Sequence, residues 1–115
     1  MTWGFEFYKI NQVLIKKHIK MKIKNVTVAG TGVLGSQIAF QTAFKGFEVS
    51  AYDINDEALE KAKERYKVLM ERYQEDEYGT KEEVEAAYNR ISLHTDLARA
   101  VEKADLVIEA VPELL

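Results

Sequence analysis

The spacing of three glycines and one aspartate is the feature of this sequence that indicates a binding site. Gly30, Gly32 and Gly35 lie in "VTVAGTGVLGSQIAF", between a β-branched apolar run and a stretch with helical spacing. Asp53 follows Gly35 by eighteen residues and ends the segment "FEVSAYD". A G-x-G-x-x-G turn between a strand and a helix, followed by an acid at this distance, is typical of a dinucleotide-binding site.

Each glycine has its own mechanical reason in such a turn. Gly30 allows a tight turn out of the strand, and Gly32, which has no Cβ, lets a pyrophosphate approach the backbone. Gly35 lets the helix pack closely on the strand. The free N–H groups and the dipole at the start of the helix then favour an anion. The alternative interpretation is a glycine-rich corner with no ligand.

Asp53 predicts which cofactor the turn would hold. A carboxylate at the end of the second strand can accept the hydroxyls of an adenosine ribose, and it repels the 2′-phosphate of NADP. The next residue is Ile54 and not a phosphate-binding arginine. The pattern therefore favours NAD. The alternative is that Asp53 only begins the cap of the following helix.

Strand and helix patterns alternate along the rest of the chain. Apolar β-branched runs predict four strands, and helical spacing with capping residues predicts four helices between them. The strands are expected at 23–29, 47–53, 90–94 and 105–111, and the helices at 34–45, 56–75, 80–89 and 96–103. Asn55 or Asp56 can cap the second helix, Thr80 and Glu83 form a capping box, and Thr95 can cap the last helix.

Strands joined through helices must pair in parallel, and right-handed crossovers place helices on both faces of the sheet. We therefore predict an α/β fold with a Rossmann-type doubly wound parallel sheet that is incomplete, with the first four strands only. In that order the fourth strand lies beside the first. The segment after it, including Val111 and Glu113, then faces the same crevice as the glycine turn. Glu113 is a candidate contact for the second ribose of the cofactor, or else an ordinary exposed loop acid.

Length and composition limit the class of protein. The 115 residues support one domain, and the absence of cysteine excludes disulfides and thiolate sites. A net charge of −3 argues against a general nucleic-acid binder, and no stretch is apolar enough to span a membrane.

Residues 1–24 carry six lysines and one glutamate, without the features of a secretory signal. We interpret 1–21 as an N-terminal extension, with an interaction helix as the alternative, and 22–115 as a partial NAD-binding domain in a cytoplasmic protein.

Two segments together resemble a known family. "VAGTGVLGSQIAFQTAFKGFEVSAYDINDEALEKA" and "ADLVIEAVPE" are similar to the NAD-binding domain of 3-hydroxyacyl-CoA dehydrogenases, over essentially residues 22–115. The resemblance implies pyrophosphate contacts along Gly30–Gly35, including the backbone near Val33 and Leu34. It also implies Asp53 on the adenosine ribose and Glu113 near the nicotinamide ribose. Leu114 follows where the family often has asparagine.

The resemblance implies reversible oxidation of a 3-hydroxyacyl-CoA to a 3-ketoacyl-CoA by NAD, in fatty acid metabolism, by an enzyme that is a homodimer. The family's general base is a histidine oriented by a glutamate, both well beyond the fourth strand. No catalytic residue is therefore assigned here, and we expect this chain alone to be inactive. The alternatives are a stand-alone, non-catalytic dinucleotide-binding module and a fragment of another NAD- or FAD-dependent oxidoreductase.

The two histidines offer no substitute base. His18 lies in the N-terminal extension, and His94 ends the third strand, which the expected strand order places far from the fourth. We interpret His94 as a surface residue. No metal-ligand spacing and no nucleophilic triad is visible in the sequence.

Overall fold

A computed structural model describes residues 22–110. Its elements follow the order β-α-β-α-α-β-α-β that the sequence pattern predicts. They are β1 (Asn25–Ala29), α2 (Val33–Phe44), β2 (Glu48–Tyr52), α3 (Asp56–Glu75), α4 (Lys81–Asn89), β3 (Ile91–His94), α5 (Leu97–Val101) and β4 (Leu106–Glu109). The N-terminal extension, Val111 and Glu113 lie outside the described residues.

The four strands form one parallel sheet in the order β3-β2-β1-β4. β1 lies at the centre, where Val28 is in register with Ala51 of β2 and with Ile108 of β4. The prediction of a parallel sheet with β4 beside β1 is confirmed, and the fold is of the Rossmann type. The carboxyl ends of β1, β2 and β4 therefore share one edge, where ligands bind in such folds.

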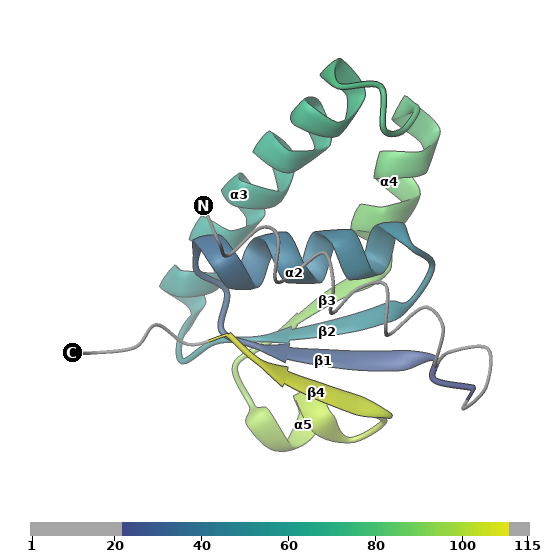
Figure 1. The fold of residues 1–115 in the computed structure, drawn as a ribbon. Coiled ribbons are helices and arrows are strands. Elements are labelled where there is room, and N and C mark those ends of the chain that lie inside the picture. The colour runs from purple at the N-terminus through teal and green to yellow at the C-terminus, as the bar shows by residue number, and fades with distance from the viewer. Residues whose placement is uncertain (1–21, 111–115) are drawn as a thin grey trace.

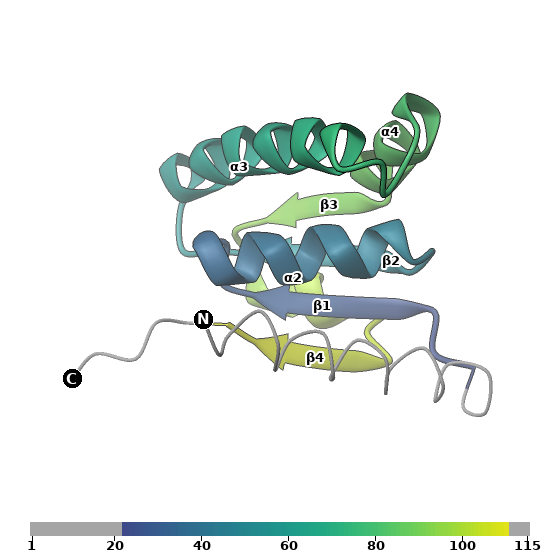
Figure 2. The ribbon, with the colours of Figure 1, turned by 45° about the horizontal axis from the view of Figure 1, so that its top comes forward.

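Helices cover both faces of the sheet, as the crossover rule requires. Figure 1 shows α2, α3 and α4 on one face and α5 on the other, and Figure 2 shows α2 lying along β1. The core lies under the three-helix face, where Val28, Phe40, Tyr66 and Val84 are fully buried. Burial of these side chains holds α2 and α3 in fixed positions over the sheet.

Local signals explain most helix ends. Asn55 caps α3 by accepting a hydrogen bond from the Ala58 amide at 2.9 Å. Thr80 and Glu83 form the expected capping box at the start of α4. Gly46 ends α2 with a φ of 105°, a conformation that favours glycine.

The prediction that Thr95 caps the last helix is wrong. Asp96, and not Thr95, is the N-cap of α5, because the Asp96 carboxylate accepts hydrogen bonds from the Ala98 and Arg99 amides. With its N-cap at position 96, α5 is shorter than the expected 96–103 and contains five residues. A carboxylate at the N-cap also interacts favourably with the helix dipole, which explains why Asp96 takes this position.

Candidate cofactor-binding site

The glycine turn has the geometry that its spacing predicts. Gly30 has a φ of 108°, and its amide donates to the Tyr52 carbonyl at 2.8 Å, so the chain leaves β1 in a tight turn against β2. A Cβ on Gly35 would collide with the Gly30 carbonyl, whereas a Cβ on Gly32 would meet no atom within 4 Å. Gly35 is thus required for packing, and Gly32 keeps an approach to the backbone open.

The first turn of α2 presents amides without intrahelical acceptors. The N-cap is Gly32, whose lack of a side chain leaves these N–H groups without a side-chain cap. Val33 begins the helix with 66% of its surface exposed, and Leu34 packs partly against the core. Backbone N–H groups at Gly32, Val33 and Leu34, together with the helix dipole, can therefore hold an anion.

Asp53 lies beside this turn and is bound to it. Its Oδ2 accepts hydrogen bonds from the Thr31 amide at 2.9 Å and from the Thr31 hydroxyl at 2.6 Å. Its Oδ1 accepts from the Ile54 amide at 2.7 Å. Because Asn55 caps α3, the interpretation of Asp53 as only a helix cap does not hold. A carboxylate has about four acceptor positions, so one remains on Asp53 for a ligand hydroxyl.

The environment of Asp53 keeps the carboxylate ionised. Partial burial opposes ionisation, but the hydrogen bonds from Thr31 and Ile54 and the nearby charge of Arg65 outweigh it. Together they hold the pKa of Asp53 below its ordinary value of 3.8. At neutral pH the site therefore carries a full negative charge beside the glycine turn.

Thr31, Ser36 and Arg65 belong to this site, although the sequence pattern did not predict them. Thr31 is 1% exposed, and while its hydroxyl and amide face Asp53, its carbonyl accepts from the Ser36 hydroxyl at 2.8 Å. Arg65 of α3 donates to the same carbonyl at 3.3 Å. Thr31 lies between the first two glycines and Ser36 follows the third, so both are polar residues in an apolar stretch. Their polarity is the sequence feature that could have indicated a role in the turn.

A cavity of about 340 Å³ opens where these residues meet. Its lining combines the turn, the end of β2 and the exposed side of α3. The lining residues are Thr31, Gly32, Asp53, Ile54, Asn55, Glu57, Ala58, Lys61 and Arg65. Ile54 and Ala58 give one apolar side and Asp53 gives an acceptor, the combination that an adenosine needs.

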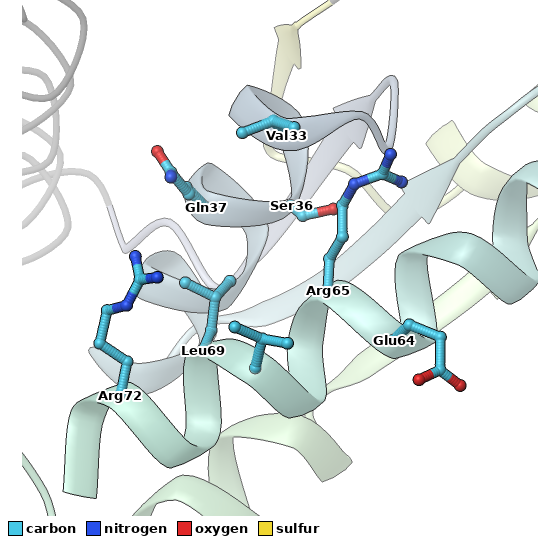
Figure 3. A pocket seen from close by; sticks show the side chains of 8 residues that line it. Val33, Ser36, Gln37, Glu64, Arg65, Leu69 and Arg72 are labelled. Atoms are coloured by element: carbon cyan, nitrogen blue, oxygen red, sulfur yellow. The ribbon is translucent and has the colours of Figure 1, made fainter. Parts of the chain in front are cut away.

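A second cavity, of about 260 Å³, lies between α2 and α3. Figure 3 shows Val33, Ser36 and Gln37 on one side of it and Arg65, Leu69 and Arg72 on the other, with Glu64 directed away. Arg65 lines both cavities, so its side chain separates the Asp53 cavity from the groove between the helices.

The remaining candidate residues do not join this site. His94 ends β3, which β2 and β1 separate from β4, and its Nε2 lies 2.9 Å from the Ser92 hydroxyl. Within residues 22–110, no group of three or more acidic or histidine side chains is arranged to hold a metal. The helices of the same residues are all too short or too polar to cross a membrane. The predicted roles of Val111 and Glu113 fall outside the described residues.

Comparison with protein families identifies the same region. Residues 25–115 match the model of the 3-hydroxyacyl-CoA dehydrogenase NAD binding domain. This match covers the glycine turn, Asp53 and the end of the sheet, and it identifies the cofactor as NAD.

Known proteins that resemble the chain are longer than it is. A probable 3-hydroxybutyryl-CoA dehydrogenase of Bacillus subtilis is 45% identical over 93 residues, which are 81% of this chain and 32% of the relative. The mitochondrial hydroxyacyl-coenzyme A dehydrogenase of Sus scrofa is 36% identical over 101 residues, 84% of this chain and 32% of that protein. The chain thus spans about a third of the length of these curated relatives.

Solved structures show the same architecture. A diketoreductase, studied for dual catalysis of dicarbonyl compounds, is 57% identical with a TM-score of 0.77, over 80% of this chain and 33% of that one. The 3-hydroxybutyryl-CoA dehydrogenase of Escherichia coli K12 is 35% identical with a TM-score of 0.72, over 80% of this chain and 19% of that one. Both likenesses extend the match from sequence to fold.

Proposed function

Because the chain belongs to the 3-hydroxyacyl-CoA dehydrogenase family, through that family's NAD-binding domain, we propose that it supplies the cofactor-binding part of a dehydrogenase. The reaction is the reversible oxidation of a 3-hydroxyacyl-CoA to a 3-ketoacyl-CoA, in fatty acid metabolism. One observation carries the proposal: the glycine turn and the ionised Asp53 meet at one cavity. The homodimer and the cytoplasmic location expected from the sequence are parts of the same proposal.

The residues present fit the cofactor. The open space at Gly32 and the amides of the first turn of α2 suit the pyrophosphate. Asp53 holds the adenosine ribose through the acceptor position that Thr31 and Ile54 leave free, and its charge disfavours a 2′-phosphate. NAD supplies the hydride acceptor when it is bound.

Titration of NAD and NADP into the 115-residue chain by calorimetry tests the cofactor assignment. We expect NAD to bind and NADP to bind at least about tenfold more weakly, a difference of about 1.4 kcal/mol. An Asp53→Asn variant should lose most of this preference, because the amide neither repels a phosphate nor accepts as strongly from the ribose. Equal affinity of the original chain for both cofactors would contradict the assignment.

A turnover assay with acetoacetyl-CoA and NADH tests the expected inactivity of this chain alone. Within residues 22–110, His94 is the sole histidine, and it lies on β3, at the opposite edge of the sheet from β4. Among the described residues, no histidine therefore lies near the expected nicotinamide position to act as the proton donor that the family uses. Measurable oxidation of NADH that depends on the acyl-CoA would show this part of the proposal to be wrong.

A second candidate substrate class follows from the likeness to the diketoreductase, which is 57% identical. Reduction of a dicarbonyl compound and reduction of a 3-ketoacyl-CoA are the same hydride chemistry at a ketone. Comparing kcat/KM for a β-diketone and for acetoacetyl-CoA, in a protein that carries this domain together with a substrate domain, distinguishes the two substrate classes.

The absorbance spectrum of the purified chain tests the FAD-dependent alternative, because bound flavin would give a flavin absorbance and favour that alternative.

A further inference from the structure

We propose that Arg65 is a positioning residue for the cofactor pyrophosphate: with Ser36 it holds the Thr31 carbonyl so that the Gly32 N–H faces the phosphate position. The inference rests on the proposed NAD-binding function and extends it to a residue on α3. Arg65 follows Asp53 by twelve residues and belongs to neither the glycine turn nor the ribose-binding strand end.

The first step is the contact itself. The Arg65 guanidinium donates to the Thr31 carbonyl at 3.3 Å, and the Ser36 hydroxyl donates to the same oxygen at 2.8 Å. Figure 3 shows the Arg65 side chain extending from α3 toward Ser36 at the start of α2. Two donors from two helices therefore fix the direction of one carbonyl group.

The second step follows from the planarity of the peptide bond. The peptide between Thr31 and Gly32 is trans, since the described residues contain no cis bond. In a trans peptide the C=O and the N–H point to opposite sides. Holding the Thr31 carbonyl toward Arg65 and Ser36 therefore directs the Gly32 N–H away from both, and within residues 22–110 this N–H has no acceptor.

The third step links the same residue to the ribose end of the site. The other side of Thr31 donates twice to Asp53, so the segment is held at its amide, its hydroxyl and its carbonyl. Thr31 is 1% exposed, which leaves little room for another conformation. Arg65 therefore acts on the Thr31 carbonyl and, through it, on the direction of the Gly32 N–H, whereas the Thr31 amide and hydroxyl hold the Asp53 carboxylate without Arg65.

The chain offers a matched control on the same helix. Arg72 lies seven residues after Arg65, on the same face of α3, and lines the same groove between α2 and α3. No hydrogen bond joins Arg72 to the glycine turn among the described residues. Arg65→Met and Arg72→Met remove the same charge from the same groove and retain an apolar stem of similar length.

Calorimetry with NAD, ADP-ribose and adenosine on the 115-residue chain provides the binding test. We expect Arg65→Met to weaken NAD and ADP-ribose about tenfold, the loss of one charge-assisted hydrogen bond, and to leave adenosine nearly unchanged. Arg65→Lys should recover part of the loss, and Arg72→Met should bind all three ligands like the original chain. Equal affinities of Arg65→Met and Arg72→Met for NAD would overturn the proposal.

A measurement without cofactor separates positioning from general stability. In ¹⁵N–¹H spectra we expect Arg65→Met and Ser36→Ala each to move the Gly32 amide resonance, and Arg72→Met to leave it in place. The two substitutions should couple in the NAD affinity, since both act on one carbonyl. An unmoved Gly32 resonance in Arg65→Met would overturn the proposal even if that variant bound NAD weakly. Absence of NAD binding by the original chain would instead count against the proposed function.

Discussion

The glycines of the turn have different tasks, although the sequence presents them as one motif. Gly35 is required by the fold, since a Cβ there would collide with the Gly30 carbonyl. Gly32 is not required by the fold, because a Cβ there meets no atom and its φ of −68° is open to any residue. Function and packing are therefore separable within six residues.

An alanine substitution at Gly32 should affect cofactor affinity, whereas one at Gly35 should affect stability. Gly32→Ala should keep its melting temperature but bind NAD at least about tenfold more weakly, because the methyl group occupies the approach of the pyrophosphate. Gly35→Ala should lose about 3 kcal/mol of stability, at the upper end for overpacking. Thermal melts and NAD titrations of both variants check this. A destabilised Gly32→Ala variant would contradict the separation.

Spacing predicted Asp53 but not the residues that hold it. The glycines and the acid are recognisable because the turn and the strand end impose a short-range pattern. Thr31 contacts Asp53 across 22 residues, and Arg65 contacts Thr31 across 34, so both contacts exist only after β2 and α3 have packed. No local pattern identifies which polar side chain of α3 reaches the turn.

At the scale of the elements, caps were predictable where two residues act together. The pair Thr80 and Glu83 fits a reciprocal arrangement that few other positions satisfy, and it is confirmed. Thr95 and Asp96 are adjacent and both suit an N-cap, so the sequence does not decide between them. The backbone does, since Asp96 is extended with its carboxylate toward the first amides of α5.

Alanine substitutions distinguish the two candidate caps. Asp96→Ala should lower the free energy of unfolding by about 1 kcal/mol, because the Ala98 and Arg99 amides lose their acceptor. Thr95→Ala should change it by less than about 0.5 kcal/mol, as for a typical surface substitution. Urea unfolding of both variants measures the difference, and the reverse order would restore Thr95 as the cap.

Asp105 joins the starts of β4 and β1. Its Oδ2 accepts from the Lys24 amide at 2.8 Å and from the Asn25 amide at 2.9 Å. The hydrogen bond from the Asn25 amide, followed by that from Lys24, lowers the pKa of Asp105 below its ordinary 3.8. A carboxyl group whose pKa is lower in the folded state stabilises the fold above its unfolded pKa and loses this effect as the pH falls.

Melting temperatures against pH therefore test the Asp105 contact. Asp105→Asn should melt below the original chain at pH 7, and the difference should shrink as the pH falls through 3.8 and below. The exposed Glu85 of α4 provides a control, since Glu85→Gln removes one charge without removing a hydrogen bond to β1. A pH-independent difference for Asp105→Asn would show that the charge of the carboxylate contributes nothing.

At the scale of the whole molecule, the parallel sheet, its strand order and the helices on both faces followed from the alternation of elements. What the alternation did not predict was the lengths: α5 contains five residues and β4 contains four. These ends depend on tertiary packing, which overrides local propensity. The alternation also did not predict the two cavities beside α3, since they form between elements that meet only in the folded molecule.

The described sheet has β4 at one edge, where it pairs with β1 alone. Val107 of this strand is 48% exposed, and an open apolar edge promotes pairing between molecules. We expect the 115-residue chain to associate as its concentration rises, and Val107→Lys to reduce the association. Val68→Lys is the control, because Val68 is 52% exposed but lies on a helix. Sedimentation velocity at several concentrations measures this, and a monomer at all of them would contradict it.

The central place of β1 makes that strand a reporter for the cofactor. Its backbone is hydrogen-bonded to β2 on one side and to β4 on the other, and Val26 and Val28 are almost completely buried. Deuterium should therefore replace the protons of these inner amides only when the whole domain opens. A ligand bound only by the folded state lowers the equilibrium constant for that opening by the factor 1 + [L]/Kd, so exchange slows by the same factor. Exchange rates at Val28, measured over a series of NAD concentrations, would then report the cofactor's affinity from a residue outside the glycine turn, without any chromophore or enzymatic turnover.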